Sequence, residues 1–402
     1  MKKDRSVLVL TTSFPTRFSS AAGLFVFEKC RYLVKNKIQV KVIAPGHERE
    51  KRKEIIHGIS VKRFRYFFPA KLQRLAYGAG IPTNLKTSFL AKIQLPIFLF
   101  AFFVSTLNEV RRYKIIHCHW SLAGLVGVVA AKLFNKKIVL MMHGAEVFVL
   151  GDHPVLKFLL RNVDFLISNS TYTEEKTLKV FPVNNHAVIS PGVDIDQYYP
   201  QSKISNLRER LNIAASEIFL LAIGNFIQRK GFEYLIEALN IIVHQKGINN
   251  IKLGIGGRGP LRTKYEDMVE TYALSNYVDF FGFIDAKEMP SYYTQADIFV
   301  LPSIIDEMGD TEGLGVVLLE ANACKTPIIG SRVGGITDII QDGVNGLTVA
   351  QKDPADLAEK IITLADDKNL RAEMGENGRK FVEANFNWNS IAQKVINVYD
   401  LL

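Results

Sequence analysis

Glu312 and Glu320 lie eight residues apart, and the Gly-x-Gly turn between them at 313–315 opens an apolar helix. Glycine lets a backbone approach a ligand closely, and the start of a helix presents unpaired N–H groups to an anion. From these positions Glu320 can reach a neutral polyol such as a ribose, and Glu312 can accept hydrogen bonds from sugar hydroxyls. An acidic first helical turn is the structural alternative for Glu312 alone. The second glycine pair at 334–335, which follows a strand-like segment and opens another helix, fits that alternative less well.

Lys230 lies where the segment 222–231 ends a strand and opens a helix, with Arg229 beside it. A lysine in this position can neutralise the negative charge that builds on a departing diphosphate. A cation in the first turn of a helix opposes the helix dipole, which disfavours a purely structural role. The two basic residues therefore predict an anion clamp.

Two candidates lie in the first half of the chain. His143 follows a predicted strand and precedes a glycine, and loops after strands often carry binding and catalytic residues. Gly23 opens a helix after the first strand, where its amide can approach a phosphate or a sugar. The structural alternatives are a core histidine and a tight entry turn.

A literal Gly-x-Gly-x-x-Gly at 254–259 follows a strand, and Asp279 lies 20 residues after its last glycine. This pattern is the fingerprint of dinucleotide-binding oxidoreductases. However, Pro260 places the last glycine before the helix, and Asp279 falls in the middle of its strand. The pattern is therefore a weak indication of that class.

Asp194 and Asp196 form an Asp-x-Asp of a kind that can hold a divalent metal, but they fall in a turn-rich segment, where we expect turn and capping roles. We find no His or Cys cluster with metal-ligand spacing and predict no metal site. The three cysteines are Cys30, Cys118 and Cys324; they are widely spaced in apolar segments and indicate a reducing compartment.

Short β-rich apolar runs alternate with helical patterns along all 402 residues. Continuous apolar strands alternating with helices predict parallel sheets covered on both faces, hence two doubly wound α/β domains. We place the joint near 190–200, which gives domains over 1–197 and 198–385, and expect a helix at 386–402 to pack back on the first domain. Ligands of such sheets bind beyond the carboxyl ends of the strands.

The charge is divided unevenly between the two halves. Residues 1–195 contain 30 Lys and Arg against 12 Asp and Glu, a net of +18, whereas residues 196–402 have a net of −8. The basic half predicts an anionic partner, and a membrane surface ranks above nucleic acid because no nucleic-acid-binding motif is present. The segment 61–77 interleaves five basic residues with aromatics, which fits either a membrane-docking surface or an edge strand and solvated loop.

The segment 85–107 is the most membrane-like part of the chain, but its uninterrupted apolar core of about ten residues is too short to span a bilayer. We predict a helix packed on the sheet. The N-terminus has the pattern of a first β-strand and not of a signal peptide. We therefore expect a cytoplasmic protein that associates peripherally with the inner face of the cell membrane.

Together these residues resemble the GT-B fold retaining glycosyltransferases of family four (glycosyl transferases group 1), and are similar to members that build bacterial cell-surface polysaccharides. The matching motifs are Glu312/Glu320, Gly257-x-Gly259-Pro260, Phe281-Gly282, Pro191-Gly192-Val193-Asp194, Lys230-Gly231, Gly23, His117-x-His119 and His143-Gly144.

The resemblance implies two doubly wound Rossmann-like domains facing across a cleft, the first binding the acceptor and the second the nucleotide-sugar. It implies that Glu320 holds the ribose and that the amides of Gly315 and Val316 hold the phosphate. The family usually has Arg where this chain has Asn225, and Asp where it has Glu146. The catalytic candidates are His143, Lys230 and Glu312, and the substrate-binding candidates are Gly23, Asn225, Arg229, Gly315, Val316 and Glu320.

The sequence thus predicts a retaining hexosyltransferase that uses a UDP- or GDP-sugar, a lipid-linked or polysaccharide acceptor, and no cofactor. We find no carboxylate placed as a nucleophile, and retention in this family is thought to rely on the leaving phosphate as the base, which requires a strong anion clamp. The open alternatives are a nucleotide-sugar 2-epimerase on the same fold, an NAD-dependent oxidoreductase and a non-catalytic sugar-binding protein.

Overall fold

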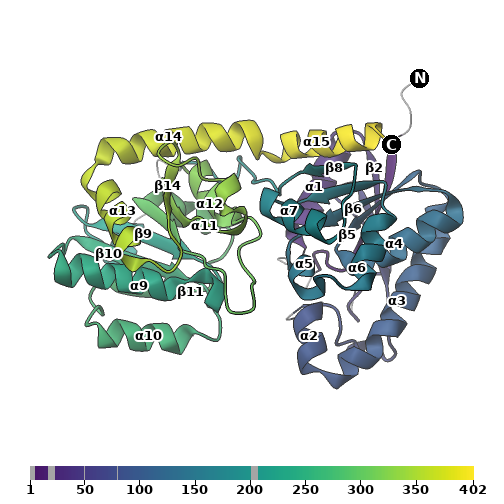
Figure 1. Cartoon of the computed structure of the whole chain (residues 1–402), viewed down its shortest axis with the longest axis horizontal. Helices are drawn as coiled ribbons and strands as arrows, with labels where there is room; N and C mark the ends of the chain where they lie inside the picture. The colour runs from purple at the N-terminus through teal and green to yellow at the C-terminus, as the bar shows by residue number, and fades with distance from the viewer. Residues whose placement is uncertain (1–4, 17–22, 49, 79, 201–206) are drawn as a thin grey trace. The chain divides into compact units, whose positions relative to one another are not determined.

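The chain folds into two compact units in a computed structural model, which describes residues 5–16, 23–48, 50–78, 80–200 and 207–402 (Figure 1). Unit 1 comprises Met1–Pro191 and Trp388–Leu402, and unit 2 comprises Gly192–Asn387. The division falls at residue 191, six residues before the boundary placed from sequence, and the last helix belongs to unit 1.

Unit 1 contains an eight-stranded sheet in the order β3-β4-β2-β1-β5-β6-β7-β8, parallel except for the hairpin of β3 and β4. Its strands are β1 (Ser6–Thr11), β2 (Gln39–Pro45), β3 (Lys53–Ile56), β4 (Ile59–Phe64), β5 (Ile115–His119), β6 (Lys137–Met142), β7 (Phe165–Ser168) and β8 (His186–Val188). Its helices are α1 (Leu24–Lys35), α2 (Ile81–Thr87), α3 (Phe89–Val110), α4 (Ser121–Phe134), α5 (Ala145–Leu150), α6 (Pro154–Arg161), α7 (Thr171–Val180), α15 (Trp388–Asp400) and the short 3₁₀ turn η1 (Ala70–Leu72).

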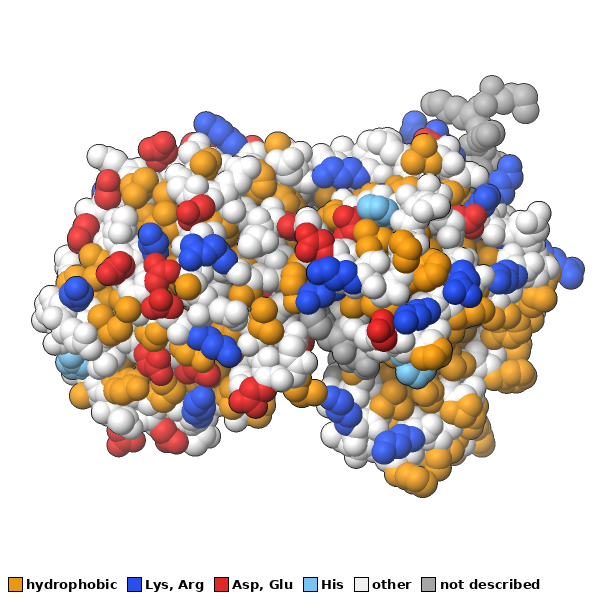
Figure 2. Space-filling model, in the orientation of Figure 1, with side chains coloured by type: hydrophobic (Ala, Val, Ile, Leu, Met, Phe, Trp, Pro, Cys, Tyr) orange, Lys and Arg blue, Asp and Glu red, His pale blue; other side chains and the backbone are white. Residues whose placement is uncertain are grey.

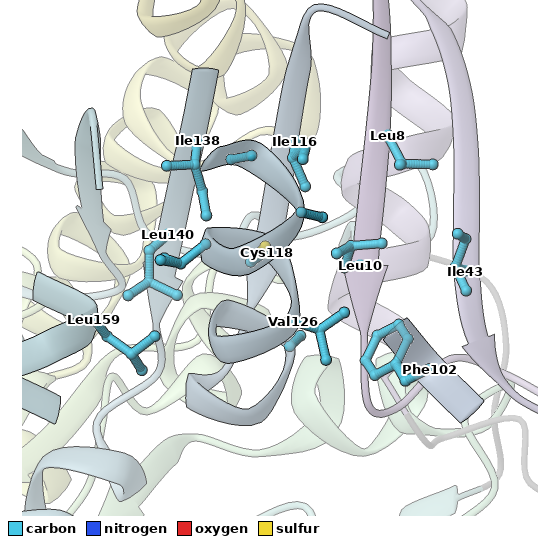
Figure 3. Packing of buried hydrophobic residues seen from close by; sticks show 14 of the residues in the cluster. Leu8, Leu10, Ile43, Phe102, Ile116, Cys118, Val126, Ile138, Leu140 and Leu159 are labelled. Atoms are coloured by element: carbon cyan, nitrogen blue, oxygen red, sulfur yellow. The ribbon is translucent and has the colours of Figure 1, made fainter. Parts of the chain in front are cut away.

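Side chains alternate between the two faces of this sheet. Leu8 and Leu10 of β1 point to the face covered by α3, α4 and α6, where Phe102 and Leu159 pack (Figure 3). Val9 points to the opposite face, which α1 and α15 cover. Strands buried on both faces explain the continuous apolar runs of the sequence.

Unit 2 contains a parallel sheet in the order β11-β10-β9-β12-β13-β14. The strands are β9 (Ile218–Ile223), β10 (Ile251–Gly256), β11 (Val278–Gly282), β12 (Ile298–Leu301), β13 (Ile328–Ser331) and β14 (Gly346–Val349). The helices are α8 (Leu207–Arg210), α9 (Phe232–Asn240), α10 (Arg262–Thr271), α11 (Met289–Gln295), α12 (Val316–Ala323), α13 (Pro354–Asp366) and α14 (Lys368–Asn385), with the short turns η2 (Gln228–Lys230), η3 (Ile241–Gln245) and η4 (Gly334–Asp338).

The apolar segment predicted at 85–107 forms the end of α2 and most of α3. Ser88 separates the two helices and caps α3 by accepting a hydrogen bond from the Ala91 amide at 3.3 Å. Phe98 and Phe102 are buried against Phe64 of β4. The ring centroid of Phe64 lies 5.2 Å from that of Phe98 and 4.7 Å from that of Phe102. The predicted packing of this helix on the sheet is confirmed.

Arg63 corrects the prediction for the segment 61–77. The sequence offered it as one of the basic residues of a membrane-docking surface, but its side chain is buried. Its Nε lies 2.9 Å from Glu54 and 3.5 Å from Glu50, and its Nη2 donates to the carbonyl of Pro15 at 2.6 Å. Arg63 sits on a strand paired on both sides, so its charge is neutralised inside unit 1.

Candidate functional site

The candidate site of unit 2 lies at the carboxyl ends of β9 and β12. The strand order reverses here, because β10 follows β9 on one side and β12 pairs with β9 on the other. The loops after these two strands are joined by a hydrogen bond of 2.8 Å from the Ile304 amide to the Arg229 carbonyl. A reversal of this kind is where open α/β sheets bind ligands.

Two glycines allow the loop after β9 to take this path. Gly231 has a φ of +63°, and a Cβ on it would lie 2.1 Å from the Pro302 carbonyl oxygen, so a larger residue would separate the two loops. A Cβ on Gly224 would lie 3.2 Å from Cε of Lys230. The glycines therefore leave room for the Lys230 side chain to lie across the loop.

Lys230, Arg229 and Glu312 meet at this edge of the sheet. The Lys230 ammonium donates a hydrogen bond to Glu312 Oε2, and both residues are buried. Arg229 Nη1 lies 3.9 Å from Glu312 Oε1 and donates to the Thr311 carbonyl at 2.8 Å. The structure thus brings together three of the residues singled out in the sequence.

The charges of this cluster determine the state of Glu312. Burial alone would raise the pKa of the Glu312 carboxyl, but Lys230 and Arg229 outweigh burial and hold the pKa below its ordinary value. Asp310, whose Oδ2 lies 3.6 Å from Arg229 Nε, shows the opposite balance, since burial raises its pKa despite the nearby guanidinium. Glu312 is therefore an ionised carboxylate held between two cations.

Helix α12 starts directly after this cluster. Gly315 precedes Val316, the first helical residue, with a φ of +90°. A Cβ on Gly315 would also press on the side chains of Leu318 and Leu301 at 3.2 and 3.3 Å. The glycine sets the direction of the helix start. The Leu318 amide already donates to the Gly315 carbonyl at 2.9 Å, which leaves the amides before it, those of Gly315 and Val316 included, as the ones that can bind an anion.

The glycine pair Gly334–Gly335 fixes the loop that carries Glu312. The Gly335 amide donates to the Glu312 carbonyl at 3.0 Å. A Cβ on Gly334 would lie 2.1 Å from that carbonyl oxygen, and one on Gly335 would lie 2.3 Å from the Gly313 carbonyl oxygen. The two glycines begin the short 3₁₀ turn η4. They let its backbone pack directly against the backbone of residues 312 and 313.

Glu320 lies one turn into α12 and is half-buried. The Tyr293 hydroxyl donates to its Oε2 at 2.7 Å, and the Tyr198 hydroxyl forms a second hydrogen bond. Burial raises the pKa of Glu320 to about 7, and these two hydrogen bonds only partly oppose the rise. Neither tyrosine was singled out in the sequence, because nothing in their local patterns marks them as partners of Glu320.

Other residues of unit 2 are placed as follows. Asn225 is exposed in the loop after β9, between Gly224 and the Lys230 turn. Gly254 lies inside β10, and Asp279 is exposed at the second position of β11, away from its carboxyl end. The dinucleotide fingerprint therefore lacks its geometry here.

In unit 1, His143 follows β6 and is half-buried. Its Nε2 lies 3.1 Å from Nδ1 of His119, and its ring packs against Phe25 and Trp120. Burial, together with the nearby charge of Lys29, holds the pKa of His143 well below its ordinary value. His143 is therefore a neutral imidazole. Its Nε2 is engaged with His119, and its Nδ1 is left to donate or accept one hydrogen bond with a ligand.

Glu146 caps the turn that carries His143. Its Oε2 accepts the His143 amide at 3.1 Å, and burial raises the pKa of the carboxyl to about 7. Its Oε1 is buried and has no hydrogen-bond partner in the part of the chain that the structure describes. The extra methylene relative to aspartate is accommodated by this capping contact.

Behind His143 lies a chain of buried polar residues. The sequence marked His117 and His119 as a motif, but it did not predict that Tyr399 and Lys29 join them. His119 stacks on His117, with ring centroids 4.7 Å apart, and His117 Nδ1 lies 2.6 Å from the Tyr399 hydroxyl of α15. Lys29 of α1 is also buried, with its ammonium directed at the sulfur of Met141. Burial lowers the pKa of Lys29 to about 7.

Gly23 and Asp194 have clear local roles. Gly23 has a φ of +67°, and a Cβ on it would lie 2.3 Å from the Ser13 carbonyl oxygen, so it allows the tight entry into α1. Asp194 Oδ1 accepts the amides of Asp196 and Gln197 at 3.1 and 3.3 Å, which is the turn role predicted for it. Among the described residues, no three His, Cys, Asp or Glu side chains gather as metal ligands would.

Two family models match the chain over separate ranges. The model described as glycosyl transferases group 1 matches residues 203–381, and the model described as Glycosyltransferase Family 4 matches residues 22–197. An uncharacterized glycosyltransferase of Methanocaldococcus jannaschii is 27% identical over 409 residues, covering 98% of this chain and 98% of that protein.

A second relative is the GDP-mannose-dependent alpha-(1-6)-phosphatidylinositol monomannoside mannosyltransferase of Mycolicibacterium smegmatis. It is 30% identical over 271 residues, which cover 66% of this chain and 70% of that protein.

Two solved structures with the same fold each cover 99% of this chain. Sucrose-phosphate synthase from Thermosynechococcus elongatus has a TM-score of 0.78 and 25% identity, covering 99% of this chain and 98% of that one. Anabaena HepE in complex with UDP and glucose has a TM-score of 0.75 and 19% identity, covering 99% and 100%. The predicted fold class, GT-B with two Rossmann-like domains, is confirmed.

Proposed function

Because this chain belongs to the glycosyl transferases of group 1, we propose that it moves a hexosyl unit from a UDP- or GDP-sugar to a lipid-linked or polysaccharide acceptor, with retention of the anomeric configuration. The observation that carries this proposal is the cluster of Lys230, Arg229 and Glu312 beside the start of α12. It supplies two cations and free helix amides at the edge of the sheet where α/β domains bind nucleotides.

In this proposal Lys230 and Arg229 hold the diphosphate of the donor. Lys230 loses little side-chain entropy when the donor binds, because Glu312 and the loop packing already hold its side chain in place. The amides of Gly315 and Val316 bind a phosphate at the positive end of α12. Asn225, in the same loop as Arg229 and Lys230, contributes a neutral side chain where the family usually has a cation.

Glu320 binds the ribose in its ionised state, when the lone pairs of its carboxylate that the two tyrosines do not use accept hydrogen bonds from the ribose hydroxyls. Glu312 has two functions. Its Oε2 orients Lys230, and its Oε1 accepts a hydrogen bond from a hydroxyl of the transferred sugar. His143 hydrogen-bonds the transferred sugar as a neutral imidazole, and the Gly23 amide binds the donor.

The chemistry follows from the charges of the cluster. Glu312 is committed to two cations, and this pairing makes it a poor nucleophile toward an anomeric carbon. The leaving diphosphate therefore takes the acceptor proton on the same face of the sugar, while Lys230 and Arg229 stabilise the charge that develops on it. No cofactor or metal takes part in this scheme.

The names of relatives support the substrate classes. The mycobacterial relative is named for a GDP-mannose donor and a phosphatidylinositol mannoside acceptor, and the Anabaena protein was solved with UDP and glucose. We propose the same classes here, with a role in cell-envelope polysaccharide biosynthesis.

A thermal-shift screen over UDP-, GDP- and ADP-sugars identifies the donor, because a ligand of the folded state raises the apparent stability by mass action. The selected donor is then incubated with polyprenyl-diphosphate-linked sugars, nucleoside diphosphate release is measured, and the product anomer is assigned by NMR. We expect release that depends on acceptor and a retained configuration. Conversion of the donor sugar without acceptor would establish an epimerase, and donor binding without release would establish a non-catalytic binding protein.

A further inference from the structure

Helix α3 of unit 1 carries an exposed apolar stripe. Phe89 and Phe100 are 78% and 69% exposed, and Ile93, Ile97 and Val104 between and beyond them are exposed as well. Their spacing of three and four residues places them on one face of the helix. Within the described residues, α3 is also the helix whose length and apolar composition suffice to cross a membrane.

The opposite face of α3 is committed to the interior of unit 1. Gln94 is buried; its amide donates to the Leu72 carbonyl at 2.7 Å, and its oxygen accepts the Arg74 amide at 2.8 Å. Phe98 and Phe102 pack on the sheet, as described above. A helix with one face bound to a sheet cannot be surrounded by lipid, but its exposed face can enter the interfacial region of a bilayer.

The sequence around the stripe is free of negative charge. Residues 55–108 contain seven Lys and Arg and no Asp or Glu. Lys62 and Arg63 pair with glutamates, whereas the remaining five are exposed: Arg65, Lys71, Arg74, Lys86 and Lys92. Figure 2 shows hydrophobic side chains along the margin where Figure 1 places α3, with basic side chains near α2 below it. A basic rim around an apolar face complements an anionic lipid surface.

A cavity of about 480 Å³ adjoins the stripe. It is lined by Ile97 of α3, by the guanidinium-bearing Arg52 and Arg65, and by aromatic residues that include Phe68, which is 91% exposed. Two arginines at the edge of an apolar surface provide the planar donors that bind a phosphate.

We propose that the α3 stripe, defined as Phe89, Ile93, Ile97, Phe100 and Val104, docks in the plane of an anionic phospholipid bilayer, with Phe68 inserted beside it and Arg52 and Arg65 on a headgroup phosphate. A second copy of the chain fits this face poorly. A two-fold contact through the stripe would bring the basic rim of one copy against the same rim of the other.

Sedimentation with liposomes tests the proposal. The full chain should sediment with vesicles of phosphatidylglycerol and phosphatidylcholine at low salt, and much less with phosphatidylcholine alone. Binding should weaken as salt rises, because the Debye length is about 10 Å at 0.1 M. Equal binding to both vesicle types at all salt concentrations would overturn the electrostatic part, and no binding to either would overturn the proposal.

Two pairs of variants locate the surface. Phe89→Ser/Phe100→Ser should lower the partition coefficient at least about tenfold, whereas Phe283→Ser/Val344→Ser, which removes exposed apolar side chains from unit 2, should not change it. Lys86→Glu/Lys92→Glu should lower it by more than about tenfold, whereas Lys246→Glu/Lys368→Glu changes the net charge equally at exposed sites of unit 2 and should have a much smaller effect. If each control matches its test variant, the stripe is not the docking surface.

The same variants distinguish a protein partner. The side chains substituted in these variants are exposed, so the thermal transition of each variant should remain within a few degrees of that of the wild type. Light scattering after gel filtration should give the same mass for wild type and Phe89→Ser/Phe100→Ser. A wild-type dimer that this variant converts to monomer, with liposome binding unchanged, would assign the stripe to a second copy of the chain and overturn the proposal.

Discussion

The Lys230 ammonium and the Glu312 carboxylate form a buried ion pair, although 82 residues separate them in the sequence. The pair joins the loop after β9 to the loop after β12, and Arg229 lies on its other side. This arrangement holds a cation at the edge of the sheet before any donor arrives. It also means that each residue affects both stability and the proposed chemistry, and these two effects have to be measured separately.

Lys230→Ala should lower turnover by roughly 30- to 1,000-fold, since losing an anion-stabilising donor costs about 2–4 kcal/mol in the transition state. It should also reduce stability, because Glu312 is left buried without its main partner. Adding Glu312→Gln should restore much of the thermal stability but none of the turnover. A loss of turnover below threefold in the single variant would make Arg229 the principal clamp.

Glu320→Ala and Glu312→Ala should affect different kinetic constants. Glu320→Ala should weaken donor binding about tenfold or more, and Glu312→Ala should mainly lower kcat, because a hydrogen bond to a charged group contributes about 1.5–3 kcal/mol. Donor binding is followed by calorimetry and turnover by release of nucleoside diphosphate. Wild-type constants in both variants would remove this pair of residues from the site.

The titration of Glu320 should give donor binding a pH dependence. Burial raises the pKa of Glu320 to about 7 in the free protein, so the carboxyl is largely protonated at pH 6 and ionised at pH 8. Because the ionised form accepts the ribose hydroxyls, donor affinity should increase as pH rises from 6 to 8 and then level off. Glu320→Gln should abolish this slope. An affinity that falls with pH in the wild type would contradict the assignment.

The sequence predicted the parts of the site that depend on local pattern. Glu312, Glu320 and Lys230 were found because glycines, strand ends and helix starts surround them. The loops that carry Lys230 and Glu312, and the helix start that carries Glu320, converge because parallel strands end at one edge of a sheet. The two α/β units were also predictable. A parallel strand that is buried on both faces has a continuous apolar run, and the runs rich in Val, Ile and Leu indicated such strands.

Pairings between distant segments could not be predicted. Tyr293 reaches Glu320 from a different helix, and nothing near Tyr293 in the sequence indicates a carboxylate partner. Arg63 illustrates the opposite error, in which a buried residue is predicted to be exposed. Its local pattern, a basic residue in an aromatic-rich segment, is that of a surface residue, but Glu54 and Glu50 neutralise its charge inside the fold. Tertiary packing decides both cases.

Activity should survive excess EDTA. In the proposed scheme Lys230 and Arg229 supply the positive charge that a divalent ion supplies in other enzymes, and Asp194 is occupied with turn amides. Turnover is measured with and without chelator after extensive dialysis. Complete inhibition that Mg²⁺ or Mn²⁺ reverses would show that a metal takes part, and Asp194 and Asp196 would be the first residues to test by substitution.

The buried Lys29 should reduce stability in a pH-dependent way. Burial lowers the pKa of its ammonium to about 7, far below the ordinary value of 10.5. Between these values the folded state binds fewer protons than the unfolded state, so this residue makes stability rise with pH from about 7 to 10.5. Lys29→Met should therefore raise the Tm by several degrees at pH 6.5, and the gain should shrink as pH approaches 9.5. Lys29→Gln should show the same trend, because it also removes the charge. Calorimetric scans at both pH values measure the difference, and a gain that is equal at the two values would show that packing, and not the buried charge, determines the effect.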